Sequence, residues 1–166
     1  GIWQPVRLII TDSIKIEEII IEPKTDGGKF KIVINNQRNQ SASIELRFSI
    51  TDKNNQELTA WKNKKEITDI DTIIIEKKGL TPLLWSPENP NLYQVKIQIA
   101  ESKKILDNKE ETFGFRTFEI HEGKFYLNGK PYWIRGANHP PIGIAPNNKK
   151  LAEKFLKLSQ EGNQNF

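Results

Sequence analysis

The sequence predicts a mainly β chain, the larger part of which is a two-sheet antiparallel sandwich of the immunoglobulin-like class. Apolar and polar residues alternate in a series of short runs, turn-forming residues separate these runs, and no helical stretch interrupts them before residue 119. A period of two along a strand sends alternate side chains to opposite faces, so one face is buried and the other is exposed. About seven such strands over about 100 residues are typical of an immunoglobulin-like sandwich.

Six runs carry the alternating pattern. They cover residues 14–22, 29–35, 43–51, 72–76, 91–100 and 111–120. In the clearest run, SIELRFSIT (43–51), Ile44, Leu46, Phe48 and Ile50 are expected to face the core. The residues expected to share one face in two other runs are Phe30, Ile32, Ile34, Tyr93, Val95, Ile97 and Ile99. There is no Cys-Trp-Cys pattern, which excludes an antibody-type domain, and a fibronectin-like topology is equally compatible with these runs.

Turn-forming residues fill the gaps between the runs. KTDGGK (24–29) contains Asp-Gly-Gly, a strong short-range turn signal. DKNNQE (52–57) is expected to form a polar hairpin tip, and the two prolines of SPENPN (86–91) exclude a strand or a helix. The lysine-rich residues 62–65 are expected to lie in a polar loop.

The pattern changes at residue 119. GKFYLNGKPYWIRG (123–136) is expected to form two strands joined by Asn128-Gly129, which supplies the two positive-φ positions of a type I′ turn. A long irregular loop, GANHPPIGIAPNNKK (136–150), follows the second strand. This loop separates the hairpin from the next regular element.

The segment NNKKLAEKFLKLSQEGN (147–163) predicts a helix. Asn147 or Asn148 is expected to cap its start, and Gly162 to end it in the left-handed conformation. Its apolar stripe consists of Leu151, Phe155 and Leu158, widened by Ala152 and Leu156.

The strand, loop and helix, followed by the approach to another strand in NQNF (163–166), form the opening of a βαβ unit. Such a unit needs a parallel partner strand. A (β/α)₈ barrel typically needs about 250 residues, so the segment after residue 119 is too short to close one. The sequence is therefore expected to be a fragment that ends where a larger domain begins.

Composition excludes several classes of function. The net charge is +4, but the lysines are scattered beside acidic residues, which favours solvated loops over a nucleic-acid surface. Cysteine is absent, and the two histidines, His121 and His139, are far apart in the sequence, so we expect no metal site and no cofactor. No apolar run approaches the roughly 20 residues that span a bilayer, and the N-terminus lacks the order of a signal peptide. We therefore expect neither a nucleic-acid partner nor a membrane partner.

Four segments carry a resemblance to a known family. GKFYLNGKPYWIRGANHPP (123–141) resembles the start of the catalytic barrel in glycoside hydrolase family 2, which includes β-galactosidases, β-mannosidases, β-glucuronidases and exo-β-glucosaminidases. The matching residues are Phe125, Leu127, Asn128, Gly129, Lys130, Pro131, Arg135, Gly136 and Asn138. LWSPENPNLY (84–93), FGFRTFEI (113–120) and GIWQPV (1–6) are similar to other segments of the family, in the family's order.

The resemblance implies a division of the chain into three parts. Residues 1–11 would be the tail of an N-terminal jelly-roll domain, and residues 12–119 the immunoglobulin-like sandwich. Residues 120–166 would be the first, incomplete segment of the (β/α)₈ barrel: a hairpin, the first barrel strand over 132–135, a loop and one helix.

The resemblance also implies the chemistry of the parent enzyme, which is expected to hydrolyse terminal β-glycosidic bonds with retention and to be most similar to β-galactosidases. Retention needs two carboxyl groups roughly 5–5.5 Å apart. In the family both are glutamates that follow the fourth and seventh barrel strands, which would lie beyond Phe166. The chain is therefore expected to contain no catalytic residue and to be inactive alone.

Two residues are expected to bind substrate in the parent enzyme. Asn138 and His139 would follow the first barrel strand, and active sites of such barrels form at the C-terminal ends of the strands. The alternatives are that Asn138 caps the backbone of the loop and that His139 is an ordinary loop residue. For Arg135, a structural role is favoured over a role in the site.

The alternative function is a stand-alone β-sandwich module that binds carbohydrate or protein. Trp3 and Trp61 are candidates for stacking on sugars, although large aromatic residues more often pack in a core. The expected partners in the first hypothesis are the saccharide and the remaining domains of the parent. Self-association through the exposed segment that starts the barrel is also expected. The absence of cysteine leaves the compartment open, and a periplasmic or extracellular parent is compatible with it.

Overall fold

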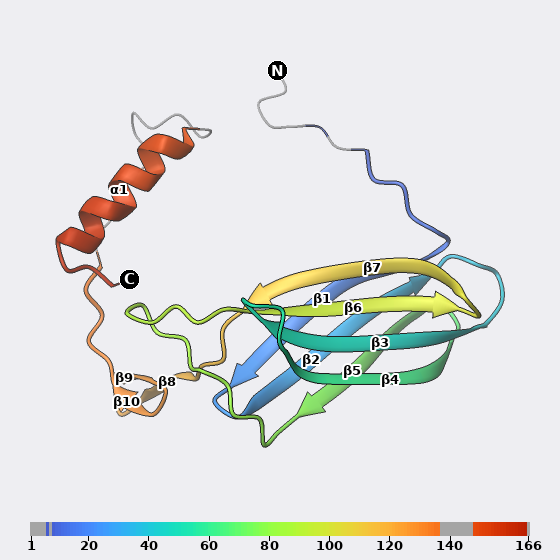
Figure 1. Ribbon diagram of the computed structural model, residues 1–166, viewed down its shortest axis with the longest axis horizontal. Coiled ribbons are helices and arrows are strands. Elements are labelled where there is room, and N and C mark those ends of the chain that lie inside the picture. Colours follow the sequence, from blue (N-terminus) through green and yellow to red (C-terminus); the bar gives the residue numbers. More distant parts are fainter. Residues whose placement is uncertain (1–5, 7, 137–147, 166) are drawn as a thin grey trace. The chain divides into compact units, whose positions relative to one another are not determined.

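The computed structural model describes residue 6, residues 8–136 and residues 148–165, and it divides into two compact units, 1–116 and 117–166. In the described residues there are ten strands and one helix, and all paired strands are antiparallel (Figure 1). The prediction of a mainly β chain is thereby confirmed.

The first unit contains two sheets. Its strands are β1 (Ile14–Lys24), β2 (Gly27–Asn36), β3 (Ala42–Asp52), β4 (Glu57–Ile67), β5 (Ile70–Lys77), β6 (Tyr93–Glu101) and β7 (Lys104–Phe113). One sheet has the order β1-β2-β5 and the other β4-β3-β6-β7, and the two are layered on each other in Figure 1. The fourth strand thus pairs with the third, whereas in constant-type immunoglobulin domains it pairs with the fifth.

The core lies between the inner faces of these two sheets. Every residue expected to face the core in the run 43–51 is buried, as are the residues expected to share a face in β2 and β6. Phe30 of one sheet meets Phe48 of the other edge to face, with ring centroids 4.9 Å apart. Phe113 continues this contact at 5.6 Å from Phe30, so aromatic rings join the two layers.

The long connection between β5 and β6 is anchored by a tyrosine. Tyr93 is buried at the start of β6, and its hydroxyl accepts a hydrogen bond of 2.8 Å from the backbone N–H of Leu83, ten residues earlier. This is the arrangement known as the tyrosine corner in immunoglobulin-like sandwiches. It satisfies a buried phenol and at the same time fixes the loop.

Trp85 occupies the same end of the sandwich. Its backbone N–H donates to the carbonyl of Phe115 at 2.8 Å, and the Arg116 guanidinium lies 4.7 Å from its ring centroid. A Cβ atom added to Gly114 would lie only 2.5 Å from the Cβ of Trp85, so the glycine is required for this close packing.

The open edge between the two sheets is closed by side chains of β7. The ladder of β1 is interrupted by a register shift between Ile16 and Glu18. At this irregularity the Ile16 N–H donates to the Asp107 carboxylate at 2.8 Å, and the Lys109 ammonium donates to the Glu17 carbonyl at 2.9 Å. The backbone groups that the bulge leaves unpaired are thus satisfied across the layers.

Two expectations for the first unit are wrong. Lys62, Lys64 and Lys65 do not lie in a loop but in β4, which forms the edge of its sheet and pairs only with β3. The run 111–120 is not one strand, because β7 ends at Phe113 and the next strand, β8 (Phe118–His121), begins after a break. The packing of Trp85 against Gly114 falls within this break.

The second unit contains β8, β9 (Lys124–Leu127), β10 (Lys130–Pro131) and the helix α1 (Lys149–Glu161). Asn128 and Gly129 have φ of 53° and 75°, as a type I′ turn requires. Asn148 caps the helix, as one of the two predicted candidates, by accepting from the Leu151 N–H at 3.1 Å.

Two expectations for the second unit also differ from the structure. The first barrel strand expected over 132–135 does not form, and residues 132–136 have no regular secondary structure, so the start of a barrel stays a prediction. Gly162 has φ of −76°, and Asn163 takes the left-handed conformation instead, with φ of 59°. Asparagine tolerates this region better than most residues, which permits the shift by one position.

Asn36 is the buried polar side chain in the described part of the first unit. Its amide donates to the carbonyls of Gln40, Ile67 and Thr68 at 3.0, 3.2 and 3.2 Å, and its oxygen accepts from the Arg38 N–H at 3.0 Å. One side chain therefore holds both the β2–β3 loop and the β4–β5 turn.

Replacing Asn36 by alanine should deprive these buried and partly buried backbone groups of their side-chain partner. We expect Asn36→Ala to lower the free energy of unfolding by about 1–3 kcal/mol, the cost of unsatisfied buried polar groups. Urea denaturation measures this difference. Asn35→Ala is the matched control, because the Asn35 side chain makes an exposed hydrogen bond of 3.3 Å to Glu17 and should contribute little. Equal effects of the two substitutions would contradict the anchoring role.

Candidate functional site

The two predicted substrate-binding residues, Asn138 and His139, lie outside the described residues. The structure does describe both flanks of their loop, namely residues 132–136 before it and the helix α1 after it. The geometry of the candidate site is therefore read from these flanks.

The segment before the loop is hydrogen-bonded to the residues that follow the helix. The Arg135 N–H donates to the Asn165 side-chain oxygen at 2.7 Å, and the Asn165 N–H donates to the Arg135 carbonyl at 2.8 Å. The Asn165 side-chain amide donates to the Trp133 carbonyl at 3.0 Å. The helix thus returns the chain to the segment from which the loop departed.

Arg135 reinforces this return. Its Nε donates to the Asn163 carbonyl at 2.7 Å, and one of its Nη atoms donates to the Asn163 side-chain oxygen at 3.1 Å. Arg135 is itself exposed, and the structural role in a barrel that the sequence favours for it stays a prediction.

The tryptophans differ in their suitability as sugar platforms. Trp61 is half-buried and packs against the sandwich core, and Trp85 is packed as described above, whereas Trp3 lies outside the described residues. Trp133 is 79% exposed and borders an apolar groove together with Phe125 and Tyr132. Sequence reasoning did not single out Trp133 as a platform, because nothing in its run distinguishes an exposed tryptophan from one that faces a core.

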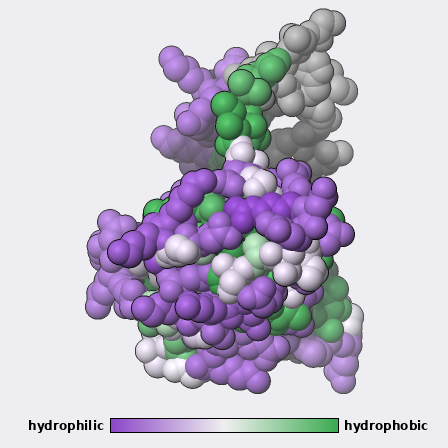
Figure 2. Space-filling model, turned by 90° about the vertical axis from the view of Figure 1, so that its right-hand side faces the viewer, coloured by the Kyte–Doolittle hydropathy of each residue, from purple (hydrophilic) through white to green (hydrophobic). Residues whose placement is uncertain are grey.

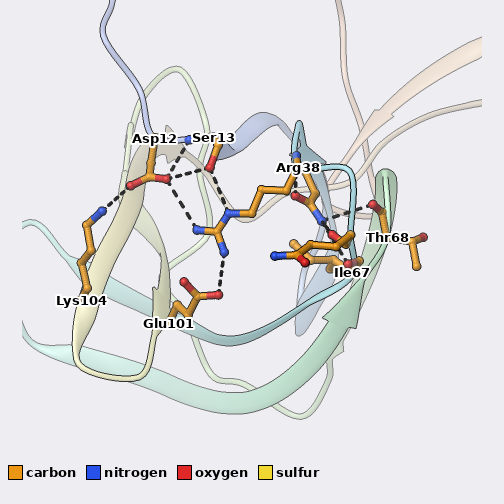
Figure 3. Close-up of polar contacts among 9 residues, drawn as sticks. Asp12, Ser13, Arg38, Ile67, Thr68, Glu101 and Lys104 are labelled. Carbon is orange, nitrogen blue, oxygen red and sulfur yellow. Dashed lines mark hydrogen bonds and ion pairs between the residues drawn. The ribbon is translucent and has the colours of Figure 1, made fainter.

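A polar cluster ties together three segments at one end of the sandwich (Figure 3). Arg38 donates from Nε to the Ser13 hydroxyl at 3.0 Å and from Nη1 to the Glu101 carboxylate at 2.8 Å. Asp12 accepts from the Lys104 ammonium at 2.6 Å and from the Ser13 N–H at 2.7 Å. The hydrogen bond from Lys104, followed by those from Ser13, lowers the pKa of Asp12 to about 2.

The cluster is a structural device, because each charge in it is matched by an opposite one. It joins the segment before β1, the β2–β3 loop and the β6–β7 turn. In the described part of the chain there is also no group of three or more histidine, aspartate or glutamate side chains that could hold a metal ion. Nor does that part contain a helix long and apolar enough to cross a membrane.

The fold defines an immunoglobulin-like sandwich that is followed by a small unit of three short strands and one helix. The family model described as Glycosyl hydrolases family 2 matches residues 14–116, which include every strand of the sandwich. The chain therefore belongs to glycoside hydrolase family 2.

Curated relatives align with almost the whole chain. A protein of Formosa agariphila named putative beta-glucuronidase is 31% identical over 173 residues, which cover 98% of this chain and 16% of the relative. A protein of Thermoanaerobacter pseudethanolicus named beta-galactosidase is 31% identical over 152 residues, which cover 83% of this chain and 19% of the relative. The chain thus spans about a fifth or less of the length of these relatives.

Solved structures agree with the sequence comparison. The crystal structure of a Bacteroides uniformis beta-glucuronidase matches with a TM-score of 0.74 and 26% identity, over 94% of this chain and 21% of that one. A beta-glycosidase from Bacteroides vulgatus matches with a TM-score of 0.71 and 25% identity, over 96% of this chain and 21% of that one. Both matches extend beyond the sandwich into the second unit.

The polar cluster predicts a pH dependence of stability. Because the pKa of Asp12 is lower in the folded chain than its ordinary value of 3.8, its contribution is complete above that value and is lost as the pH falls toward 2. Asp12→Asn should therefore flatten the loss of stability between about pH 4 and pH 2. Denaturant unfolding at several pH values measures the slope. Glu88→Gln, on an exposed loop, is the control, and an unchanged slope in Asp12→Asn would show that the cluster does not carry the effect.

The flanks of the loop should separate when Asn165 is shortened. Asn165→Ala removes the acceptor of the Arg135 N–H and the donor to the Trp133 carbonyl. We expect the amide hydrogen of Arg135 to exchange roughly fivefold faster, because a hydrogen bond worth about 1 kcal/mol is lost. Hydrogen exchange followed by NMR measures the rate. Lys157→Ala is the control, since it removes only an exposed ion pair with Glu161, and equal rates in both variants would refute the link.

Proposed function

We propose that this chain is the sandwich and barrel-start portion of a retaining glycoside hydrolase that cleaves terminal β-glycosidic bonds and is β-galactosidase-like. The proposal rests on the share of this chain, and of each relative, that the alignments cover. Proteins named beta-glucuronidase and beta-galactosidase align over 98% and 83% of this chain, whereas it spans only 16% and 19% of them. The rest of the catalytic machinery would then lie in the remaining domains of the parent, which are the expected partners of this chain.

The second unit supplies the first part of the barrel in this proposal. Residues 132–136, the expected loop, the helix and residues 162–165 follow one another in the chain, and the first and last of these segments are joined by the hydrogen bonds of Arg135 and Asn165. A βαβ unit has the same order of parts. Pairing of residues 132–136 with further barrel strands would complete the strand that is not formed here.

Asn138 and His139 are the substrate-binding residues in this proposal. They follow residues 132–136 in the sequence, and barrel enzymes build their active sites at the C-terminal ends of the strands, which is where the proposed first strand would end. An asparagine amide offers both a donor and an acceptor, which suits the hydroxyl groups of a sugar. Asn138 and His139 are therefore proposed to bind substrate, not to catalyse.

The catalytic carboxyl groups are proposed to lie beyond Phe166. In the retaining reaction one carboxylic acid protonates the leaving oxygen while a carboxylate attacks the anomeric carbon. Water then hydrolyses the glycosyl-enzyme intermediate, and the first group acts as the base. The chain contributes scaffold and substrate contacts, but no group that forms or breaks the glycosidic bond.

The proposal is tested by comparing the chain with the longer enzyme. The purified 166-residue chain should show no turnover of 4-nitrophenyl β-galactoside, whereas the full-length protein should hydrolyse it faster than the glucuronide. In the full-length protein, Asn138→Ala should lower kcat/KM by roughly tenfold or more, the cost of an unpaired buried hydroxyl. Asn54→Ala, in an exposed turn of the sandwich, is the control. Turnover by the isolated chain would place a catalytic pair inside it and overturn the proposal.

A further inference from the structure

A charged depression lies on the outer face of the four-stranded sheet. Three strands form it, because β4 contributes Ala60 and Lys62, β3 contributes Arg47 and Ser49, and β6 contributes Lys96 and Gln98. Its volume is about 450 Å³. Hydrophilic side chains also predominate on the face of the molecule shown in Figure 2, so an outer surface rich in charge is not itself unusual. The arrangement of the charges is what distinguishes this depression.

The strand register places short residues at its floor and long ones at its walls. Ser49 lies opposite Ala60 on one side and opposite Lys96 on the other. In the next row, Arg47 lies opposite both Lys62 and Gln98. The short side chains of Ser49 and Ala60 leave space that the longer neighbours surround.

Two cations are directly opposed in this register. Arg47 and Lys62 face each other across the β3–β4 ladder, and like charges in this position destabilise a sheet. Lysines are common on edge strands because they prevent pairing with other chains. That role would be served equally by an acidic residue opposite Arg47, so it does not explain why a second cation stands there.

The positive charge of the lining is only partly neutralised. Arg47 donates to Glu45 at 2.6 Å and to Gln98 at 2.8 Å, and Lys96 forms an ion pair with Glu110 at 2.7 Å. Among the described residues no carboxylate lies within 4.0 Å of the Lys62 ammonium, although its charge, after the hydrogen bond from Arg47, contributes to the lowered pKa of Glu45. The residues that line the depression include three cations and no carboxylate.

We propose that this depression binds an acidic oligosaccharide through the carboxylate of a uronic acid unit. Arg47 is suited to a carboxylate because its planar guanidinium has further N–H donors besides those that Glu45 and Gln98 engage. Lys62 and Lys96 add charge on either side. Gln98 can exchange hydrogen bonds with sugar hydroxyls, and the aliphatic stems of the lysines offer apolar contact to the ring. The choice of a saccharide over another anion rests on the proposed function in glycoside hydrolysis.

A binding titration on the 166-residue chain tests the proposal. NMR would follow the amide signals of β3, β4 and β6 during addition of tetragalacturonate, with the carboxyl-reduced, neutral tetramer as the matched ligand. The variant Arg47→Gln/Lys62→Gln/Lys96→Gln should raise the Kd for tetragalacturonate by at least about tenfold, because charge-assisted hydrogen bonds are lost. Lys53→Gln/Lys78→Gln/Lys103→Gln removes the same charge from exposed positions outside the strands and should change the Kd by less than about twofold.

A single substitution separates binding from folding. Lys62→Glu places an opposite charge across from Arg47 and should raise the midpoint of urea unfolding while it weakens binding. If Lys62 had only a structural role, Lys62→Glu would change the midpoint of urea unfolding without weakening the binding of tetragalacturonate.

The proposal is overturned if tetragalacturonate does not bind, if the neutral tetramer binds equally well, or if both triple variants lose affinity alike. Tighter binding of a short DNA duplex at the same residues would assign the surface to nucleic acid instead. None of these outcomes depends on hydrolysis, so the proposal can fail while the glycosidase function stands. Conversely, absence of β-glycosidase activity in the longer enzyme would leave the measured affinity unchanged.

Discussion

The contact of aromatic rings across the two sheets is the constraint on which the sandwich depends. Phe30 and Phe48 meet edge to face, and Phe113 extends the contact to Phe115 at 4.8 Å and through it to Tyr93 at 4.9 Å. Such pairs add about 0.5–1.5 kcal/mol each beyond their buried area. Because Tyr93 also accepts from the Leu83 N–H, the same cluster determines the course of the long β5–β6 connection.

The backbone adapts to this packing at two glycines. A Cβ atom at Gly27 would lie 1.9 Å from the Lys77 carbonyl oxygen, where β2 approaches β5. Gly114 is equally restricted by Trp85, and it stands at the point where β7 ends and the chain leaves the sandwich. Close approach of neighbouring segments therefore fixes both residues as glycine, and at Gly27 the φ of 158° adds to the restriction.

The inner strands of the sandwich could be predicted from the sequence, whereas the edge strand β4 could not. Strands β2, β3 and β6 are paired on both sides, so their apolar positions must all reach the core and the period of two is complete. In β4, Asn63 and Lys65 pair with the buried Leu46 and Ile44 and yet are exposed. An edge strand that diverges from the core needs no apolar residue there, and charges at inward positions protect the edge. The sequence signal of a strand is then absent although the strand is present.

The candidate site was harder to predict because its geometry depends on contacts between distant residues. No periodic pattern in the sequence indicates the hydrogen bond between the Asn165 side chain and the Arg135 backbone, because the two residues are 30 positions apart. The motif that predicts Asn138 and His139 gives their identity but not their position. Their loop begins next to a segment that Asn163 and Asn165 hold, and it ends at a helix that Asn148 caps. At both ends of the loop, asparagine side chains thus form hydrogen bonds with backbone groups that have no partner in a regular helix or sheet. The structural role of this small unit is therefore to fix where residues 137–147 leave the described chain and where they rejoin it, because binding residues need a support that is itself held in place.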